Sequence, residues 1–447
     1  MLRKLLRSAV AWGTLSLGLR ALNALIVLPL LVRLTPSTLG IWYLFLNILP
    51  LTILFDLGFG PIFGRALTQS AHPDTPGFFG HTPADLIHTA RVFYRWMAAG
   101  CFLSLSLGGG AWLAWKTVPL AHSRTVLLAW SLFCPVFAFT VALNFRRALF
   151  FGLNAVRSVQ LALAAGQGIQ IIVTWYGLLH GWGLYALAGG NTLMTATSLL
   201  VLLLLSRQQP DVRKAAAQPG RFEGRIFFSL WSASWRVFLN LTGIYLGLNA
   251  LVLAGSASLP LSTIASYGLT MQILLLGSQA AGLWMEVKQP LYAPLYASDL
   301  PALRRLFFSR LRLLLATMIL FTTALAAAGP PLLTLIHAKT PLLSLAPLGT
   351  LALYLLLYLH QSQFESLGVC LNRNSFFLPL LLSGAISCGA AFMLASRFGV
   401  WGLILGPLAV QAAFNNWWIV AQGMRIMGLA PHRYFPCLFS NAALLKP

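Results

Sequence analysis

Acidic side chains are scarce in this sequence of 447 residues, with 8 Asp and Glu together against 30 Lys and Arg. Charged residues of both signs make up only 9% of the chain, whereas a soluble globular domain carries about a quarter. Hydrophobic residues make up 58%, and the mean hydropathy is +0.79. A chain this long and this apolar would not stay dispersed in water, so we expect most of it to lie inside a lipid bilayer.

Cysteine is also scarce, and none of the five is spaced like a metal ligand. They are Cys101, Cys134, Cys370, Cys388 and Cys437. A cysteine in an apolar segment packs as a small hydrophobic side chain. We therefore expect no disulfide and no metal site.

Long apolar segments recur about twelve times, each close to the ~20 residues that a helix needs to cross a bilayer. Short polar stretches or stretches with Pro and Gly separate them. They lie near residues 9–32, 38–62, 92–115, 125–145, 157–179, 182–206, 229–253, 261–284, 311–336, 341–363, 375–396 and 400–422. The pattern predicts an all-α polytopic membrane protein with about 12 transmembrane helices.

The net charge of +22 first suggests a nucleic-acid partner. Its distribution instead follows the bias of Lys and Arg toward cytoplasmic loops. If the N-terminus is cytoplasmic, nearly all basic residues fall in the inner connections and tails. The outer connections then hold only Arg33, Lys116, Arg124, Lys339 and Arg397. We therefore expect both termini in the cytoplasm and no nucleic-acid partner.

Catalytic constellations are missing from the sequence. A membrane enzyme acting on lipid-linked sugars would need acids or a histidine in an exposed loop. The outer loops offer only His122, His180 and His337, and none has an acid nearby in sequence. No Walker-type glycine loop is present either. We expect a protein that is not an enzyme and that uses no cofactor.

The most polar stretch, residues 207–228, divides the chain nearly in half. It predicts an N-terminal six-helix bundle at 1–206, a cytoplasmic linker at 207–228, a C-terminal six-helix bundle at 229–427 and a cytoplasmic tail at 428–447. Three short matches recur at nearly one separation: Ser16 to Arg20 with Ser232 to Arg236, Leu153-Asn154 with Leu371-Asn372, and Trp182-Gly183-Leu184 with Trp401-Gly402-Leu403. Chance identity in a Leu-rich sequence is the alternative, but the common separation favours duplication. Two such halves would form pseudo-symmetric bundles around a central cavity.

Arg20 lies about midway along the first apolar segment, where a guanidinium costs roughly 2.5 to 3.5 kcal/mol on insertion scales. Arg236 occupies the matching place in the seventh segment, and no acid lies nearby in either. Each could instead reach a helix end or pair with an acid of another span. The functional interpretation is a cavity that binds diphosphate, because a guanidinium binds phosphate oxygens through paired hydrogen bonds. Further candidate cavity contacts, chosen from polarity alone, are Asn23, Asn47, Asn240 and Gln272.

Three acids approach the membrane, and all lie near the expected inner ends of spans: Asp56, Glu286 and Glu365. Carboxylates inside membranes often relay protons, so these residues are candidate coupling acids. The alternative, which we favour, is pairing with Arg65, Lys288 or another base of the inner loops.

The N-terminal quarter resembles the opening of Wzx-type polysaccharide flippases. The residues that carry the resemblance are Leu30-Leu-Val-Arg33-Leu-Thr-Pro36-Ser-Thr-Leu-Gly40-Ile-Trp42, then Asp56-Leu57-Gly58 and Gly64-Arg65. Weaker similarities are Gly152-Leu-Asn154, Gln289-Pro290 and Phe398-Gly399-Val-Trp-Gly402. These flippases belong to the multidrug/oligosaccharidyl-lipid/polysaccharide (MOP) exporter superfamily.

The resemblance implies two six-helix bundles that move a polyprenyl-diphosphate-linked oligosaccharide from the cytoplasmic to the outer leaflet by alternating access. In such proteins cationic residues of the cavity hold the diphosphate, which fits Arg20 and Arg236. It also implies a place in a bacterial inner membrane, in O-antigen or exopolysaccharide biosynthesis. Membrane lipids and a polysaccharide polymerase with other assembly proteins would be its partners.

Two other branches of the superfamily stay open as alternatives. A lipid II flippase normally has two further helices, for which this chain has no room. Drug and ion antiporters of the MATE type often carry an acid in the first helix, where this sequence has Arg20. Both departures favour the oligosaccharide branch. An enzyme acting on lipid-linked sugars is the alternative from another class.

Overall fold

The computed structural model describes residues 9–70, 82–117, 123–371, 373 and 376–440, and within this part it contains helices and no strand. Some side chains of α2 and α11 are also outside the description. The chain forms two compact units. Unit 1 comprises residues 1–34 and 45–241, and unit 2 comprises residues 35–44 and 242–447. Neither unit is one continuous stretch of sequence. The division into two bundles, linker and tail that the sequence suggests stays a prediction.

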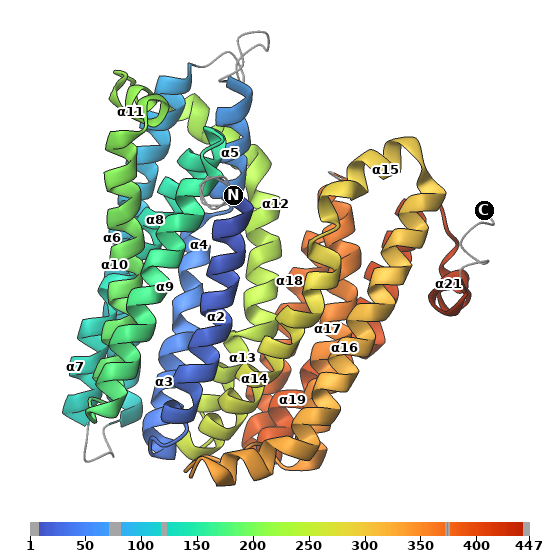
Figure 1. Ribbon diagram of the computed structural model, residues 1–447. Coiled ribbons are helices and arrows are strands. Elements are labelled where there is room, and N and C mark those ends of the chain that lie inside the picture. The colour runs from blue at the N-terminus through green and yellow to red at the C-terminus, as the bar shows by residue number, and fades with distance from the viewer. Residues whose placement is uncertain (1–8, 71–81, 118–122, 372, 374–375, 441–447) are drawn as a thin grey trace. The chain divides into compact units, whose positions relative to one another are not determined.

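Unit 1 is built from helices, and the long ones run side by side (Figure 1). They are α2 (Ala9–Leu31), α4 (Thr52–Asp56), α5 (Phe59–Ser70), α6 (Pro83–Thr117), α7 (Ser123–Phe133), α8 (Pro135–Gly152), α9 (Val156–Leu179), α10 (Leu184–Gln208), α11 (Pro210–Ala217) and the first part of α12 (Gly224–Leu248). Two helices organise the packing. α9 packs along both α2 and α10, and α8 packs against α5, α6 and α10.

Small residues allow α9 and α10 to approach closely. A Cβ added at Gly166 would lie 2.5 Å from the carbonyl oxygen of Met194, and a Cβ at Gly190 would meet the side chain of Thr174. Such close contacts between small residues are a main source of helix association in membranes, where apolar side chains gain little from contacting one another rather than lipid.

The polar stretch that follows α10 docks onto the beginning of α6. Asp85 accepts a hydrogen bond from the Arg221 backbone N–H at 2.9 Å, and Thr89 Oγ1 accepts one from the Glu223 backbone N–H at 3.1 Å. The expected linker is thus attached to unit 1 by specific hydrogen bonds. This attachment brings α11 beside the ends of α6 and α10.

Unit 2 comprises the helices of the second half of the chain and the first part of α3 (Pro36–Ile48). They are α13 (Ala250–Ser256), α14 (Leu261–Glu286), α15 (Tyr292–Ser298), α16 (Leu300–Leu335), α17 (Leu345–Cys370), α18 (Phe377–Phe398), α19 (Val400–Val410), α20 (Asn416–Ile426) and α21 (Tyr434–Phe439). A π-helical turn, Gln411–Asn415, joins α19 to α20. α14 packs on α16 and α17, and α18 packs on α13 and α19.

Nine helical segments of the described residues are long and apolar enough to cross a membrane, and the bent pair α12 and α13 makes a tenth. These ten fall on ten of the twelve segments expected from hydropathy. The other two segments fall on α2, with 23 residues, and α17, with 26 residues. The prediction of an all-α polytopic membrane protein is therefore confirmed.

Candidate functional site

A sharp corner after the second apolar segment positions Asp56. Helix α4 ends at this residue, Leu57 and Gly58 both have positive φ angles of 49° and 70°, and α5 begins at Phe59. A Cβ on Gly58 would lie 2.8 Å from the carbonyl oxygen of Ser234, so only glycine allows this approach to α12. Hydropathy suggested one continuous span here, and the structure instead breaks it directly after the acid.

The carboxylate of Asp56 is held by two hydrogen bonds. Its side chain is only 5% exposed. Tyr94 of α6 donates its hydroxyl to Oδ1 at 2.7 Å, and the backbone N–H of Gly60 donates to Oδ2 at 3.1 Å. A buried carboxylate is tolerated only when its oxygens are bonded in this way.

A cavity of about 510 Å³ lies beside this carboxylate, between α4, α5 and α8. Its polar lining residues are Asp56, Arg65, Thr68, Asn144 and Arg147. Apolar and small residues such as Ile53, Pro61 and Ala148 complete the wall. We call this space the Asp56 cavity.

The charges around the Asp56 cavity do not balance. Among the described lining residues, two guanidinium groups, those of Arg65 and Arg147, accompany a single carboxylate. The charge of Arg147 acts on Asp56, and the sequence suggested Arg65, Lys288 or another base of the inner loops as the partner. The described lining therefore carries a net positive charge, which favours an anion from outside the protein. Guanidinium groups suit phosphate or carboxylate oxygens.

The structure describes the side chain of only one of the two arginines singled out in the sequence, Arg236. Arg236 lies on α12 with an exposed side chain, and its guanidinium carbon is 5.0 Å from the ring centre of Trp235. The structure describes Arg20 only as part of the backbone of α2. A shared phosphate site formed by the two therefore stays a prediction. Arg236 does not line the Asp56 cavity.

The other predicted contacts in unit 1 are spread over three helices. Asn23 of α2 is half-buried, and its Oδ1 has no hydrogen-bond partner among the described residues. Asn47 of α3 is half-buried, and Asn240 of α12 is buried. None of these three lines the Asp56 cavity. Their role in a transport cavity stays a prediction.

The predicted residues of unit 2 lie on two helices, α14 and α17. Gln272 of α14 accepts a hydrogen bond from the Tyr43 hydroxyl at 2.7 Å. Glu286 is exposed at the end of α14, and Glu365 is buried within α17. The role of Glu286 and Glu365 as coupling acids stays a prediction.

A polar cluster that the sequence did not single out lies in the core of unit 2. The Tyr434 hydroxyl and the Nε2 atom of His360 are 2.7 Å apart, and Nδ1 of His360 is 2.6 Å from Oδ1 of Asn416. Burial raises the pKa of Tyr434 above its ordinary value, so its hydroxyl stays protonated and can donate to Nε2. His360 Nδ1–H then donates to Asn416, a residue that directly follows the π-helical turn. Such turns are frequent at functional positions.

Arg147 is a second residue that sequence reasoning missed. Arg146-Arg147 follows an apolar segment, where the sequence indicates only the bias of basic residues toward cytoplasmic loops. The structure extends α8 through Gly152 and places Arg147 in the cavity wall. Among the described residues, no group of three His, Cys, Asp or Glu side chains could hold a metal ion.

Comparisons with known proteins show similarity of fold at low sequence identity. No protein-family model matches the chain, and no curated protein matches it in sequence. A multidrug resistance MATE family transporter of the MOP superfamily, solved in an inward-facing conformation, aligns with a TM-score of 0.74 and 13% identity, covering 94% of this chain and 99% of that one. An outward-facing structure of such a transporter aligns with a TM-score of 0.61 and 12% identity, covering 95% of this chain and 98% of that one.

A flippase is also similar in fold, with a lower TM-score than the inward-facing transporter. The lipid II flippase MurJ in an inward closed conformation aligns with a TM-score of 0.61 and 11% identity, covering 97% of this chain and 91% of that chain. The described part of the chain therefore has the fold found in transporters of the MOP superfamily.

Proposed function

We propose that this protein moves a polyprenyl-diphosphate-linked oligosaccharide from the cytoplasmic to the outer leaflet of a bacterial inner membrane, by alternating access, for cell-surface polysaccharide biosynthesis. The observation that carries the proposal is the excess of positive charge in the Asp56 cavity. The cavity lies among membrane-spanning helices of a transporter fold. A substrate with a diphosphate group would supply the missing negative charge.

The diphosphate would contact the cations of the Asp56 cavity. Arg65 and Arg147 each offer a planar set of donors, and the Asn144 amide lies in the same wall. A guanidinium pairs with two phosphate oxygens at once, which fixes the orientation of the group as well as its charge. Arg20 and Arg236 are a second proposed pair of phosphate ligands.

Export of a cationic drug or an ion is the second transport candidate, and Asp56 is the observation that favours it. A buried acid within a transporter fold is a candidate for proton or cation coupling. The geometry of Asp56 argues against a direct role in cation binding, because both oxygens already accept hydrogen bonds and Arg147 acts on the same carboxylate. Flipping of lipid II would use the same phosphate chemistry.

The proposal is tested by translocation in proteoliposomes that contain the purified full-length chain and a fluorescent polyprenyl-diphosphate disaccharide. Reagent added outside quenches only the outer leaflet, so quenching reports the movement of label between leaflets. Arg147→Gln should lower the rate at least about tenfold, which corresponds to about 1.4 kcal/mol. Arg157→Gln, an exposed arginine on α9 that does not line the cavity, is the matched control and should change the rate little.

Two results would overturn the proposal. One is a wild-type protein that leaves the labelled lipid in its original leaflet while it transports a cationic dye. The other is a cell lacking the protein in which lipid-linked oligosaccharide does not accumulate on the cytoplasmic leaflet. Comparing a polyprenyl-diphosphate disaccharide that carries a peptide with one that does not separates a lipid II substrate from an oligosaccharide.

A further inference from the structure

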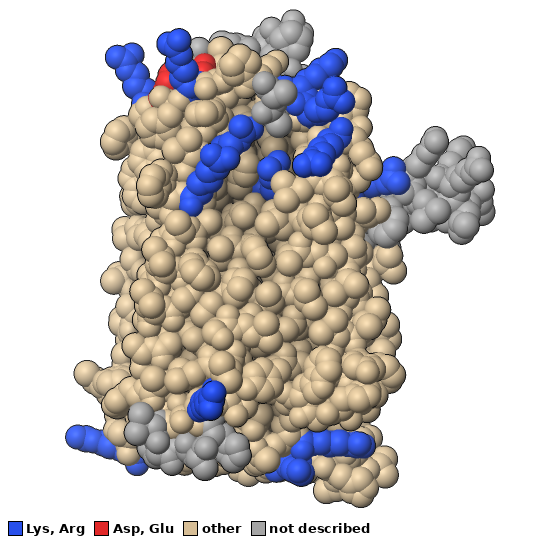
Figure 2. Space-filling view, turned by 90° about the vertical axis from the view of Figure 1, so that its left-hand side faces the viewer, with Lys and Arg blue, Asp and Glu red and all other residues tan. Residues whose placement is uncertain are grey.

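A second cavity of unit 1 is lined by basic residues. It has a volume of about 660 Å³ and lies between α6, α8, α10 and α11. Its lining residues are Arg91, Tyr94, Arg95, Ala98, Ala142, Phe145, Arg146, Leu199, Leu203, Ser206, Arg207 and Arg213. Figure 2 shows Lys and Arg side chains gathered near the two ends of one face, with a band between that holds none. We call this space the Arg146 pocket.

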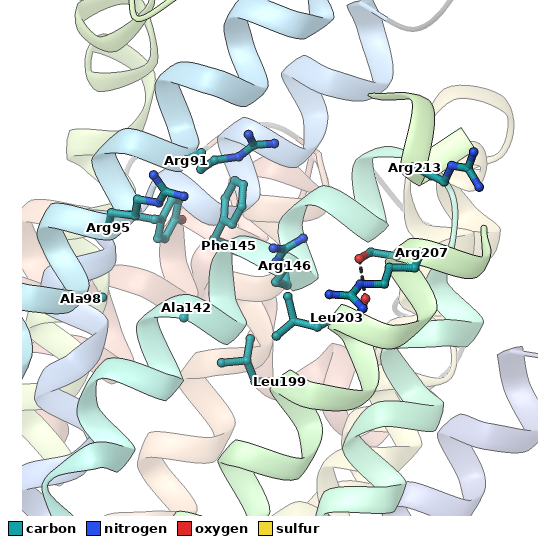
Figure 3. A pocket seen from close by; sticks show the side chains of 12 residues that line it. Arg91, Arg95, Ala98, Ala142, Phe145, Arg146, Leu199, Leu203, Arg207 and Arg213 are labelled. Atoms are coloured by element: carbon teal, nitrogen blue, oxygen red, sulfur yellow. Dashed lines mark hydrogen bonds between the residues drawn. The ribbon is translucent and has the colours of Figure 1, made fainter. Parts of the chain in front are cut away.

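Of the residues whose side chains the structure describes, twelve line the Arg146 pocket, and they include five arginines and no acidic residue. Figure 3 shows Arg91, Arg95 and Arg146 around Phe145, with Arg207 on the other side of Arg146. The charges of Arg91 and Arg95 act on Arg146, which is half-buried. Like charges held this close oppose one another, and an anion with several charges would relieve the repulsion.

The general bias of basic residues toward one side of a membrane does not explain this arrangement. That bias requires only that arginines lie beyond the ends of spans, where they extend separately into water. Here the guanidinium groups come from four helices, α6, α8 and the consecutive α10 and α11, and share one cavity. Arg146 also lies with its guanidinium carbon 5.8 Å from the ring centre of Phe145, which suits a partly dehydrated cation.

The pocket changes from basic to apolar along the helices. Along α6 the lining residues run from Arg91 and Arg95 to Ala98, and along α10 they run back from Arg207 to Leu199. Figure 3 shows Ala98, Ala142 and Leu199 together on the side away from Arg91.

Beyond the apolar side of the pocket, both flanking helices expose large apolar side chains. Leu103 and Leu107 of α6 are 55% and 70% exposed, and Leu200 of α10 is 55% exposed. Such surface on a membrane-spanning helix contacts lipid chains. The pocket and the adjoining surface together match an amphiphile with an anionic head and apolar chains.

We propose that the Arg146 pocket binds the headgroup of a membrane lipid that carries two phosphate groups, with its chains lying along α6 and α10. Two phosphates match the number and spread of the cations better than one, because Arg91, Arg95 and Arg146 form one side and Arg207 the other. The volume falls within the range of about 300 to 1,000 Å³ typical of ligand sites. This site lies beyond the proposed transport function, since it shares no lining residue with the Asp56 cavity.

The test measures lipid binding to the purified full-length protein in detergent by native mass spectrometry. The probes are diphosphatidylglycerol, a polyprenyl diphosphate, zwitterionic phosphatidylcholine and inorganic diphosphate. The first two distinguish a bilayer phospholipid from an isoprenoid carrier. At least one of them should bind with an affinity more than about tenfold above that of phosphatidylcholine. Inorganic diphosphate should bind more weakly, because it has no chains to cover the apolar surface.

The decisive variant is Arg146→Gln combined with Arg207→Gln, which should weaken binding of the preferred lipid at least about tenfold. The matched control is Arg305→Gln with Arg425→Gln, two exposed arginines of unit 2 that lower the net charge equally. The control should bind as the wild type does. Equal loss in both variants, or no loss in the first, would overturn the proposal. Arg95→Gln with Arg213→Gln provides a second lining pair if the first variant does not fold.

Discussion

Arg146 and Arg147 are neighbours in sequence, yet they line different cavities of unit 1. Successive residues of an α-helix differ by about 100° in direction, so α8 separates two spaces and contributes one arginine to each. Arg147 lies beside a buried acid, and Arg146 lies among other cations. Residues with the same chemistry thus have different environments, and the difference comes from helix packing.

The comparison suggests different sources of neutralising charge. The Asp56 cavity contains its own carboxylate, so part of the positive charge of its arginines is already neutralised before an anion enters. Among the described residues, the lining of the Arg146 pocket holds five arginines and no acid, so its excess of positive charge is larger than that of the Asp56 cavity. One residue contacts both regions: Tyr94 lines the Arg146 pocket and donates its hydroxyl to Asp56.

The largest effect is expected from Arg147→Glu, which places a second carboxylate near Asp56. Two buried carboxylates repel one another, and the cation that stabilises Asp56 is lost, so we expect translocation to fall more than about tenfold and the free energy of unfolding to drop by about 3 to 5 kcal/mol. Arg146→Glu on the other face of α8 is the control and should retain more activity. Equal losses of translocation and stability in the two variants would show that Arg146 and Arg147 do not differ in their roles.

Asp56→Ala should have the second-largest effect, a loss in the free energy of unfolding. It leaves the Tyr94 hydroxyl and the Gly60 N–H without their shared acceptor. Each unsatisfied buried group costs about 1 to 3 kcal/mol, which chemical unfolding in detergent can measure. Asp56→Asn keeps an acceptor oxygen and should lose less. If the two variants are equally stable, the hydrogen bonds at this carboxylate contribute little.

Tyr94→Phe should have a smaller effect, since it removes one hydrogen bond to a charged acceptor and keeps the ring. We expect a loss of about 1.5 to 3 kcal/mol in the free energy of unfolding. A double-mutant cycle with Asp56→Asn measures the coupling directly. Strictly additive losses would show that Tyr94 and Asp56 stabilise the fold independently.

Phe145→Leu should have the smallest effect, because it removes only the ring beside the Arg146 guanidinium. Loss of a cation–π contact of about 0.5 to 1 kcal/mol weakens lipid binding roughly twofold to fivefold. The loss should vanish when Arg146 is already Gln, a result that a general packing defect would not give. Phe137→Leu on the same helix, whose ring contacts Trp130 and Phe133, controls for lost aromatic packing.

The positions of the membrane-spanning helices along the chain could be predicted from the sequence alone. In a bilayer the backbone must satisfy its own hydrogen bonds, so long apolar segments become helices whatever surrounds them. All twelve expected segments fall on helices for this reason. The break after Asp56 was not predicted, because it depends on the approach of Gly58 to the backbone at Ser234, a residue far away in sequence.

The candidate site was predicted only in part. Asp56 stood out because acids are rare in this chain. Its partner Tyr94 did not, since a tyrosine in an apolar segment gives no signal of its own and the pairing spans 38 residues. Arg20 and Arg236 stood out because of their place within spans, and their shared site stays a prediction. His360 was missed because a lone histidine in an apolar helix gives no signal until Asn416 and Tyr434 are packed against it.

The sequence by itself determined that the chain is helical, lies in the membrane and has a large excess of positive charge. These properties follow from composition and from local apolar runs, which need no partner. The tertiary structure decided which cation faces an acid and which faces other cations. That distinction depends on the change of direction between successive residues of α8, which points Arg146 and Arg147 to different faces of the helix. It also depends on which helices pack against each face.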